Sequence, residues 1–222
     1  MERKIRAAIF DLDGTTAYTA KDLLDSMNIT MAHFGYRQLT MEQLFGHISF
    51  GERDFIKYSL PEELRDDDAV IDEARAYYAG VYAQHFLDNT CLYDGLGEVI
   101  RKMQKAGIRL AVNTNKDNGN AAAIVNKIIP DTFEYVLGYG IKATKPSPEA
   151  ALYLAEQFGV TPEETLYIGD SDIDMQTAVN AGMVAVGVTW GYRSEQILRE
   201  NGANIIVHTP AELLDVCGLN EA

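Results

Sequence analysis

Two aspartates one residue apart carry the clearest chemistry in the sequence. Asp11 and Asp13 follow the apolar run Ile5 to Phe10 and precede Gly14. Side chains at alternate positions of an extended segment can point to one side, so these two carboxylates could share a cation. Asp and Gly are also ordinary turn residues, so a simple turn at the end of a strand is the alternative interpretation of this motif.

The residues before these aspartates predict a buried strand. Ile5 to Phe10 is almost entirely apolar, which is typical of a strand covered on both faces in a parallel sheet. Asp11 and Asp13 would then lie at the carboxyl end of the strand, where ligands and reacting groups collect in open α/β sheets. Gly14 allows the chain to turn sharply there, because it has no Cβ.

Later apolar runs also lead into polar residues. We expect strands at 108–112, 135–137, 165–168, 184–188 and 205–207. Helices are expected between them, at 96–103, 121–129, 149–157 with Ser147 as N-cap and Pro148 at the first position, 171–181 and 210–216. Repeated strand, loop and helix units predict an α/β fold with a Rossmann-like parallel sheet, right-handed crossovers and helices on both faces.

The segment between the first strand and the rest of this pattern is expected to be helical. Helical spacing of apolar residues appears at 20–34, after Thr40, at 52–58 and at 68–86, and no strand is expected between Thr16 and Asn89. The glycine-bounded stretch 46–51 interrupts the helical pattern. We therefore predict an α/β core domain of residues 1–16 and 90–222 with a helical domain inserted at 17–89.

Composition limits the classes of partner. With 222 residues and 47% hydrophobic residues, the chain can bury a real core. Its net charge of −14 argues against nucleic acid, which is held by clusters of Lys and Arg. Cys91 and Cys217 are far apart, so no disulfide is expected, and the N-terminal stretch resembles neither a signal peptide nor a membrane span. These features predict a cytoplasmic protein with no membrane partner.

Four short motifs, in this order along the chain, resemble those of the haloacid dehalogenase (HAD) superfamily of phosphohydrolases. They are DLDGT at 11–15, Thr114 within LAVNTNK, Lys145 within KATKPSPEAA, and Asp170 with Asp174 within YIGDSDIDM. The similarity covers the whole chain and is greatest to the phosphoglycolate phosphatase-like branch. It implies the HAD fold, with a helical C1 cap that closes over the site and excludes water.

The resemblance also implies roles for the first aspartates. Asp11 would be the nucleophile that forms an aspartyl-phosphate, and Asp13 the general acid and then the general base. A carboxylate and a phosphate dianion repel each other, so the reaction needs a cation, and Mg²⁺ suits the hard oxygen ligands. The expected ligands are the carboxylates of Asp11 and Asp170 and the backbone carbonyl of Asp13.

Other motif residues would bind the phosphate or support the metal. The resemblance gives the Thr114 hydroxyl and the Asn115 backbone N–H as donors to the phosphate, and Lys145 as the cation that neutralises it. Asp174 would hold a metal-bound water or orient its neighbours. Asp172 is expected to be exposed.

Substrate choice is expected to depend on residues outside these motifs. In related phosphatases a glycine-containing loop faces the substrate, which makes His47 and Ser49 candidates for substrate contacts. Residues 190–192 (Trp-Gly-Tyr) also resemble the phosphatase branch and are candidates for the entrance. Thr16 and Tyr18 depart from the family pattern at the hinge of the cap and could change substrate choice or cap motion.

The sequence thus predicts a Mg²⁺-dependent phosphatase for a small phosphorylated metabolite, with 2-phosphoglycolate as one candidate. A pyrophosphatase, a phosphomutase similar to β-phosphoglucomutase and a non-catalytic binding protein on the same scaffold remain alternatives. Asp13 argues against a dehalogenase, which lacks the second aspartate. A phosphonatase would need a cap lysine, for which Lys21 and Lys57 are available. The chain could act as a monomer or a homodimer.

Overall fold

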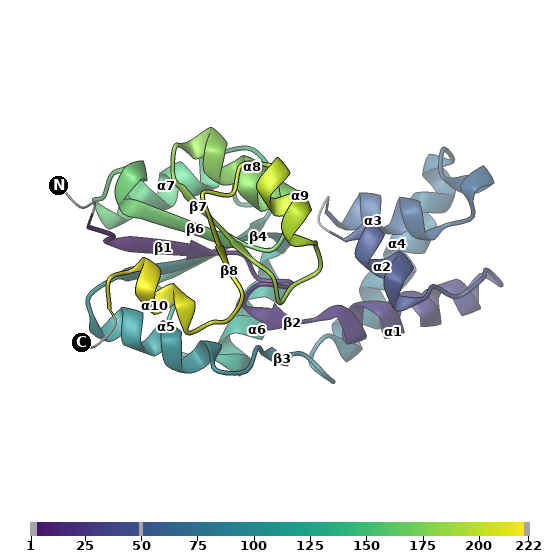
Figure 1. Ribbon diagram of the computed structural model, residues 1–222. Coiled ribbons are helices and arrows are strands. Elements are labelled where there is room, and N and C mark those ends of the chain that lie inside the picture. The colour runs from purple at the N-terminus through teal and green to yellow at the C-terminus, as the bar shows by residue number, and fades with distance from the viewer. Residues whose placement is uncertain (1–3, 49–50, 220–222) are drawn as a thin grey trace. The chain divides into compact units, whose positions relative to one another are not determined.

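The computed structural model describes residues 4–48 and 51–219. The chain forms two compact units: a core unit, Met1–Tyr18 with Leu92–Ala222, and a helical unit, Thr19–Cys91 (Figure 1). Both boundaries lie two residues later than the expected domain limits.

The core unit is built on a parallel sheet, which confirms the predicted α/β class. Within the described residues the sheet has six strands in the order β5-β4-β1-β6-β7-β8, and every pair is parallel. The strands are β1 (Ala7–Phe10), β4 (Arg109–Asp117), β5 (Tyr135–Tyr139), β6 (Thr165–Gly169), β7 (Val184–Val188) and β8 (Ile205–Val207).

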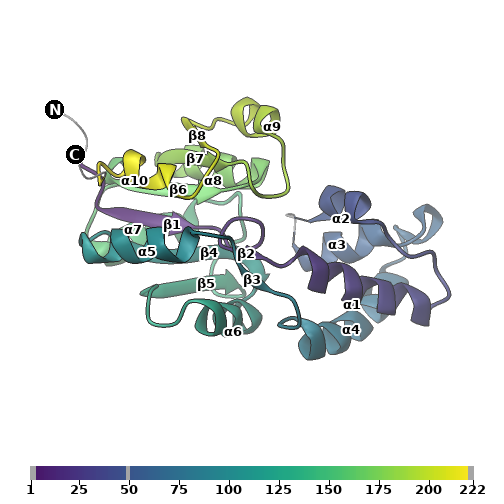
Figure 2. The ribbon, with the colours of Figure 1, turned by 60° about the horizontal axis from the view of Figure 1, so that its bottom comes forward.

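Helices cover both faces of this sheet, as the crossover rule requires. One face carries α5 (Leu96–Lys105), α6 (Asn118–Ile128) and α10 (Glu212–Val216) (Figure 1, Figure 2). The other carries α7 (Glu149–Phe158), α8 (Asp172–Ala181) and α9 (Glu195–Glu200). A short 3₁₀ turn, Pro162–Glu164, precedes β6. The sequence did not predict α9, although Ser194 caps it by accepting a hydrogen bond from Ile197 N.

The side chains of β1 alternate between the two faces of the sheet, so this strand packs against both helical layers. Ala7 and Ile9 belong to one apolar cluster with buried residues of α7 and α8, such as Leu154 and Met175. Because successive strand side chains point to opposite faces, Ala8 and Phe10 face the other layer. All four residues of β1 are 0% exposed, so β1 is a fully buried central strand.

The register of β1 aligns the strand ends that carry the polar motifs. Phe10 pairs with Val112 of β4 on one side and with Ile168 of β6 on the other. The residues that follow each strand pairing, beginning with Asp11, Asn113 and Gly169, therefore emerge at one edge of the sheet. Successive strands are added on one side of β1 up to β5 and on the other side from β6 onward, so the edge beside β1 and β6 is a topological switch point.

Besides the unpredicted α9, four details of the predicted secondary structure were wrong. First, β4 does not end at Val112 but continues to Asp117, because β5 pairs with Asn113 and Asp117 beyond it. Second, Ala17–Tyr18 forms a short strand, β2, that pairs with β3 (Cys91–Leu92) where the chain passes between the units. A strand of two residues has no alternation to detect, so only its pairing reveals it.

The other two errors concern helix ends. α2 runs through Gly46 to His47, since a glycine near a helix end costs only about 1 kcal/mol. The N-cap position of α7 is Pro148, whereas Ser147 accepts a hydrogen bond from the Glu149 N–H at 3.4 Å.

The helical unit consists of α1 (Ala20–His33), α2 (Met41–His47), α3 (Glu52–Ser59), a 3₁₀ turn (Glu62–Leu64) and α4 (Asp68–His85). Thr40 and Gln43 form a capping box at α2, which confirms the predicted N-cap. Met27 and Met31 of α1 and Ile71 of α4 are buried in this unit. Across the described residues, no helix is both long enough and apolar enough to cross a membrane.

Candidate active site

Three aspartates that are distant in sequence come together at the switch point. One carboxylate oxygen from each of Asp11, Asp170 and Asp174 lies within 4.8 Å of the other two. Asp11 follows β1, Asp170 follows β6 and Asp174 lies in the first turn of α8. All three are at most 6% exposed. The structure thus places three carboxylates in a buried cluster.

Lys145 supplies positive charge to this cluster. Its Nζ lies 2.6 Å from Oδ1 of Asp11 and 2.7 Å from Oδ1 of Asp174, and its side chain is only 4% exposed. The Asn115 side chain fixes the Lys145 backbone: its amide donates to the Lys145 carbonyl at 3.1 Å and its Oδ1 accepts from Lys145 N at 2.8 Å. β4 therefore holds the loop that presents the ammonium group.

Asp174 uses both of its oxygens within the protein. Oδ1 contacts Lys145, while Oδ2 accepts hydrogen bonds from the Ser171 hydroxyl at 2.6 Å and from Ser171 N at 3.1 Å. Ser171 and Asp174 form the capping box of α8. A Cβ on Gly169 would lie 2.3 Å from Cβ of Asp174, so only glycine fits beneath this carboxylate. These contacts suit a residue that orients Lys145.

Asp170 lies in a close-fitting cradle. Thr15 donates its hydroxyl to Oδ1 at 2.8 Å, and Tyr192 donates its backbone N–H to Oδ2 at 2.7 Å. A Cβ on Gly14 would lie 2.4 Å from Oδ2, and one on Gly191 would lie 2.3 Å from the Asp170 Cβ. Two glycines and two donors thus fix the direction in which Asp170 points.

A tight loop presents Asp11. The carbonyl of Leu12 accepts backbone hydrogen bonds from Thr15, Thr16 and Ala17, and the Thr16 hydroxyl donates to the Asp11 carbonyl at 2.6 Å. Thr16, which departs from the family pattern, is fully buried in this loop. Among the described residues, Lys145 holds Oδ1 of Asp11 and no residue donates a hydrogen bond to Oδ2.

Asp13 contacts a second lysine, which the sequence did not single out. Nζ of Lys116 lies 2.9 Å from Oδ1 and 3.1 Å from Oδ2 of Asp13, and the two side chains are 7% and 15% exposed. Thr114 lies two residues before Lys116 on β4, and its Oγ1 accepts a hydrogen bond from Lys116 N at 3.2 Å. Because an acceptor role leaves the hydroxyl proton available, Thr114 can still donate to a bound anion.

The pKa values reflect an excess of buried negative charge. Burial and then the nearby Asp174 raise the pKa of Asp170 to about 7. The same causes hold the pKa of Asp11 well above its usual range. Burial alone would lower the pKa of Lys145, but the carboxylates of Asp11 and Asp174 outweigh it and hold that pKa well above its ordinary value. Ionising all three carboxylates beside one ammonium group is therefore unfavourable.

The donor set fits a hard divalent cation. Carboxylate oxygens are the ligands that Mg²⁺ prefers, and Asp11 and Asp170 present theirs close together from neighbouring strands. The raised pKa values show that these oxygens lack sufficient positive charge, which a divalent cation would supply. A magnesium site that includes Asp11 and Asp170 is thus chemically reasonable.

Aromatic side chains surround this edge of the core unit. The rings of Tyr18 and Tyr93 meet edge to face at 6.2 Å, and Tyr93 lies 6.4 Å from Trp190. Nε1 of Trp190 donates to the Thr15 carbonyl at 3.0 Å, which ties this ring to the Asp11 loop. Burial, followed by the charge of Asp170, raises the pKa of Tyr93.

Two other expected site residues belong to the helical unit. His47 is half-buried at the end of α2, with its ring 6.2 Å from that of Tyr58. No described residue hydrogen-bonds its Nδ1, and burial lowers its pKa. Ser49 lies outside the described residues. The substrate contacts proposed for both remain predictions.

The structure also gives the surroundings of Lys21, Lys57 and Asp172, three charged residues to which the sequence analysis assigned no role in the proposed reaction. Lys21 pairs with Asp25 at 2.6 Å and Lys57 with Asp66 at 3.2 Å, in both cases on the surface. Asp172 is not exposed as expected: its side chain is 23% exposed, and Nε of Arg193 lies 3.6 Å away.

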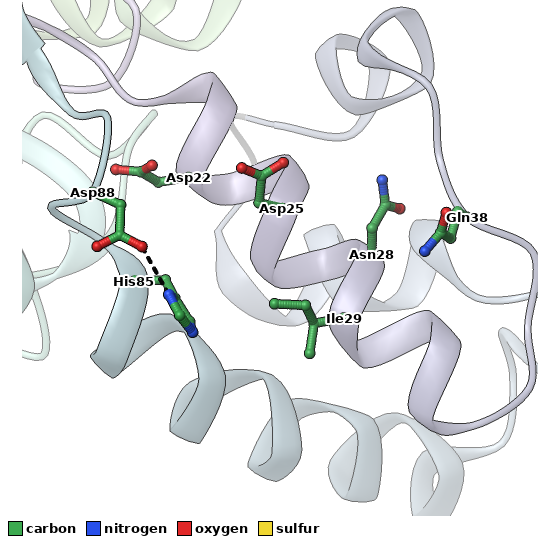
Figure 3. Close-up of a pocket in the computed structure, with 7 residues that line it drawn as sticks. All are labelled: Asp22, Asp25, Asn28, Ile29, Gln38, His85 and Asp88. Carbon is green, nitrogen blue, oxygen red and sulfur yellow. Dashed lines mark hydrogen bonds and ion pairs between the residues drawn. The ribbon is translucent and has the colours of Figure 1, made fainter.

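The helical unit has a separate pocket of about 440 Å³. Figure 3 shows Asp22, Asp25, Asn28 and Ile29 along α1 on one side, and His85 with Asp88 on the other. His85 pairs with Asp88 at 2.8 Å, and Asn28 donates to the Leu39 carbonyl at 3.1 Å. Asp22 and Asp25 also have partners of their own, in Asn89 and Lys21.

Sequence reasoning missed the residues that position the catalytic candidates: Thr15, Lys116, Gly191 and Tyr93. A partial signal existed, because Lys116 directly follows Thr114 and Asn115, and Thr15 and Gly191 lie inside motifs that were already noted. The contacts that give these residues their role, however, join segments more than 20 residues apart: Thr15 and Gly191 meet Asp170, and Lys116 meets Asp13.

Comparisons with known proteins agree with this geometry. Residues 8–188 match the family model described as "Haloacid dehalogenase-like hydrolase". A phosphoglycolate phosphatase of Thiobacillus denitrificans is 32% identical and aligns with 94% of this chain and 93% of its own length. One from Mannheimia succiniciproducens is 29% identical, with 97% of this chain and all of its own length aligned.

Solved structures show the same architecture. A crystal structure from Lactobacillus delbrueckii subsp. bulgaricus has a TM-score of 0.90 and 29% identity over 96% of this chain and 98% of its own. A haloacid dehalogenase-like family protein of Streptococcus pneumoniae, 21% identical, covers 96% of this chain and 98% of its own with a TM-score of 0.85, and shows the shared fold. The family predicted from the four motifs is therefore confirmed, and the chain belongs to the haloacid dehalogenase-like hydrolases.

Proposed function

We propose that this protein is a Mg²⁺-dependent phosphatase that hydrolyses a small phosphorylated metabolite through an aspartyl-phosphate. The observation that carries the proposal is the buried cluster of Asp11, Asp170 and Asp174 around Lys145, with Asp13 two residues after the nucleophile candidate. Phosphoryl transfer needs an in-line nucleophile, a proton donor and positive charge around the phosphate oxygens. This chain has a residue for each role.

In the first half-reaction, an oxygen of Asp11 attacks phosphorus and the bond from phosphorus to the leaving oxygen breaks. Asp13 transfers its proton to that oxygen, so the product leaves as an alcohol. In the second half-reaction, water attacks the phosphorus of the aspartyl-phosphate and gives a proton to Asp13. The bond between phosphorus and Asp11 then breaks, which releases inorganic phosphate and restores both side chains.

The binding groups are arranged for a phosphate at the same edge. Lys145 contacts Asp11 directly, so its charge lies beside the attacking oxygen. The Thr114 hydroxyl and the Asn115 backbone N–H would bind the other phosphate oxygens. When bound at Asp11, Asp170 and the Asp13 carbonyl, Mg²⁺ would offset the repulsion between the carboxylate and the phosphate.

The names of the relatives support one substrate candidate. Relatives that align over nearly the whole chain are phosphoglycolate phosphatases, so 2-phosphoglycolate is the first substrate to test. We assign substrate selection and water exclusion to the helical unit, acting as a C1-type cap with His47 and Ser49 as contacts. We further propose a cytoplasmic location and a monomer or homodimer.

The test is phosphate release from a panel that contains 2-phosphoglycolate, other monoesters, pyrophosphate and β-glucose 1-phosphate. We expect Mg²⁺-dependent release from at least one monoester and loss of that activity in EDTA. Preferred cleavage of pyrophosphate, or isomerised sugar phosphate without free phosphate, would favour the pyrophosphatase or mutase alternative. Folded protein that binds Mg²⁺ but turns over none of these compounds would contradict the proposal.

A further inference from the structure

The core unit buries a second lysine that the proposed mechanism does not use. Lys116 lies near the end of β4, with a side chain only 7% exposed. A buried ammonium group is costly unless it is paired and hydrogen-bonded. Its ammonium group contacts the carboxylate of Asp13, the candidate acid and base.

The two buried lysines have different tasks. Nζ of Lys145 contacts Asp11 and Asp174, at 2.6 and 2.7 Å, on the side of the nucleophile. Nζ of Lys116 contacts Asp13, the residue that must reach the leaving oxygen. Neither lysine can replace the other, because each ammonium group is bound to a different carboxylate.

The contact between Lys116 and Asp13 restricts the carboxylate itself. One ammonium group lies 2.9 Å from Oδ1 and 3.1 Å from Oδ2, so it contacts both oxygens of the same group. A single contact would allow the carboxylate to rotate about its last bond. A contact with both oxygens fixes the plane of the carboxylate and therefore the direction of its proton transfer.

β4 fixes Lys116 in turn. Its backbone N–H donates to Oγ1 of Thr114 at 3.2 Å, and the neighbouring Asn115 is bound to the Lys145 backbone. Three consecutive residues thus connect the phosphate-binding hydroxyl, the Lys145 loop and the Asp13 carboxylate. A proton donor held this rigidly is what efficient general acid catalysis requires.

We propose that Lys116 is a positioning residue that holds Asp13 against the leaving oxygen and, in the second half-reaction, against the attacking water. This inference rests on the proposed phosphatase function. Lys116 acts through Asp13 and touches no reacting atom. A purely structural role, in which the pair only stabilises the buried site, is the alternative that the experiments must separate.

The first experiment compares leaving groups. Lys116→Met is assayed on the best alkyl monoester of the panel and on 4-nitrophenyl phosphate, whose leaving group needs little protonation. We expect kcat/KM to fall about 100-fold for the alkyl ester, in line with a misplaced general acid, but less than about tenfold for the aryl ester. KM should change little. A structural defect would lower both values equally, and equal losses would overturn the inference.

A double-mutant cycle gives an independent test. Asp13→Asn removes the acid, so adding Lys116→Met to it should cause no further loss of kcat/KM on the alkyl ester. Losses that multiply in the double variant would show that Lys116 acts independently of Asp13, and would contradict the proposal. This cycle applies even if the wild-type protein does not accept the aryl ester.

Two more variants control for folding and charge. Lys127→Met removes an exposed lysine near the end of α6 and should leave both esters unaffected. If Lys116→Met does not fold, Lys116→Arg replaces it, because this variant keeps the positive charge but moves the hydrogen-bond donors. Its loss of kcat/KM must again be larger on the alkyl ester than on the aryl ester. Wild-type protein that cleaves no ester would overturn the proposed function and this inference together, whereas equal losses overturn the inference alone.

Discussion

Asp22 in the helical unit and Asp170 in the core unit are each 1% exposed, yet their surroundings differ. Asp22 accepts hydrogen bonds from the backbone N–H groups and the side chains of Asn89 and Thr90, at 2.7 to 3.0 Å. Asp170 accepts from Thr15 and Tyr192 but also lies beside Asp11 and Asp174.

The difference separates two uses of a buried carboxylate. The donors that converge on Asp22 satisfy its hydrogen-bonding capacity. The Asp22 carboxylate therefore links the start of α1 to the segment after α4. The core cluster instead has three carboxylates around one ammonium group, and burial raises the pKa values of Asp11 and Asp170. A satisfied carboxylate stabilises the fold, whereas a cluster with too little positive charge is suited to bind a cation.

The largest effect should come from the nucleophile. Asp11→Asn keeps the shape of the side chain but removes the attacking charge, so kcat should fall by at least about 10⁴-fold. Phosphate release on the best substrate measures this loss, and circular dichroism checks that the fold is kept. Activity near that of the wild type would exclude Asp11 as the nucleophile.

An added methyl group should weaken metal binding in the core unit but should stabilise the helical unit. In Gly191→Ala the new Cβ would lie 2.3 Å from Cβ of Asp170, so the carboxylate must move and Mg²⁺ affinity should fall at least about tenfold. Gly80→Ala in α4 meets no atom within 4 Å and should stabilise the protein by about 1 kcal/mol.

Isothermal titration with Mg²⁺ and thermal unfolding measure the two effects. Unchanged Mg²⁺ affinity in Gly191→Ala would show that the cradle around Asp170 is not required for the metal.

The core cluster should also make metal binding depend on pH. With a pKa of about 7, Asp170 holds a proton below that pH in the metal-free protein, and Mg²⁺ must displace it. The apparent affinity should be nearly constant above pH 7 and fall about tenfold per pH unit below it. Mg²⁺ titrations between pH 6 and pH 8 test this expectation.

The same shift gives the sign of a stability effect without metal. The folded state holds the Asp170 proton up to about pH 7, whereas the unfolded state releases it near the ordinary value of 3.8. Asp170 should therefore make the metal-free protein less stable as the pH rises through this window. The exposed Asp25→Asn variant should leave this dependence unchanged, and a flat affinity profile in the wild type would contradict the assignment of Asp170 as a ligand.

The smallest of these effects on activity should come from the helical unit. Asp22→Ala leaves the donors of Asn89 and Thr90 without their acceptor and should destabilise the fold by about 1 to 3 kcal/mol. The Mg²⁺ affinity of the core should not change. Chemical denaturation measures the first quantity. A loss of Mg²⁺ affinity in Asp22→Ala as large as that in Gly191→Ala would remove the distinction between the two carboxylates.

Local chemistry determined much of the fold. The apolar runs predicted every strand of the core sheet, because a strand covered on both faces is mostly apolar until it reaches the edge of the sheet. Thr40 and Ser171 marked the starts of α2 and α8, since a capping box involves only residues within one turn. The motifs identified Asp11 and Asp170, and the strand pattern predicted that they meet, because parallel strands end at one edge.

Only the tertiary structure decided which groups meet. The contact of Lys116 with Asp13 spans 103 residues, and Gly191 is required by Asp170, 21 positions earlier. The strand at Ala17–Tyr18 exists because Cys91–Leu92 pairs with it. Secondary-structure propensity and hydrophobic periodicity act over a few residues, so the sequence alone showed which residue types could take part in the site. Packing between distant segments determined which lysine serves which carboxylate.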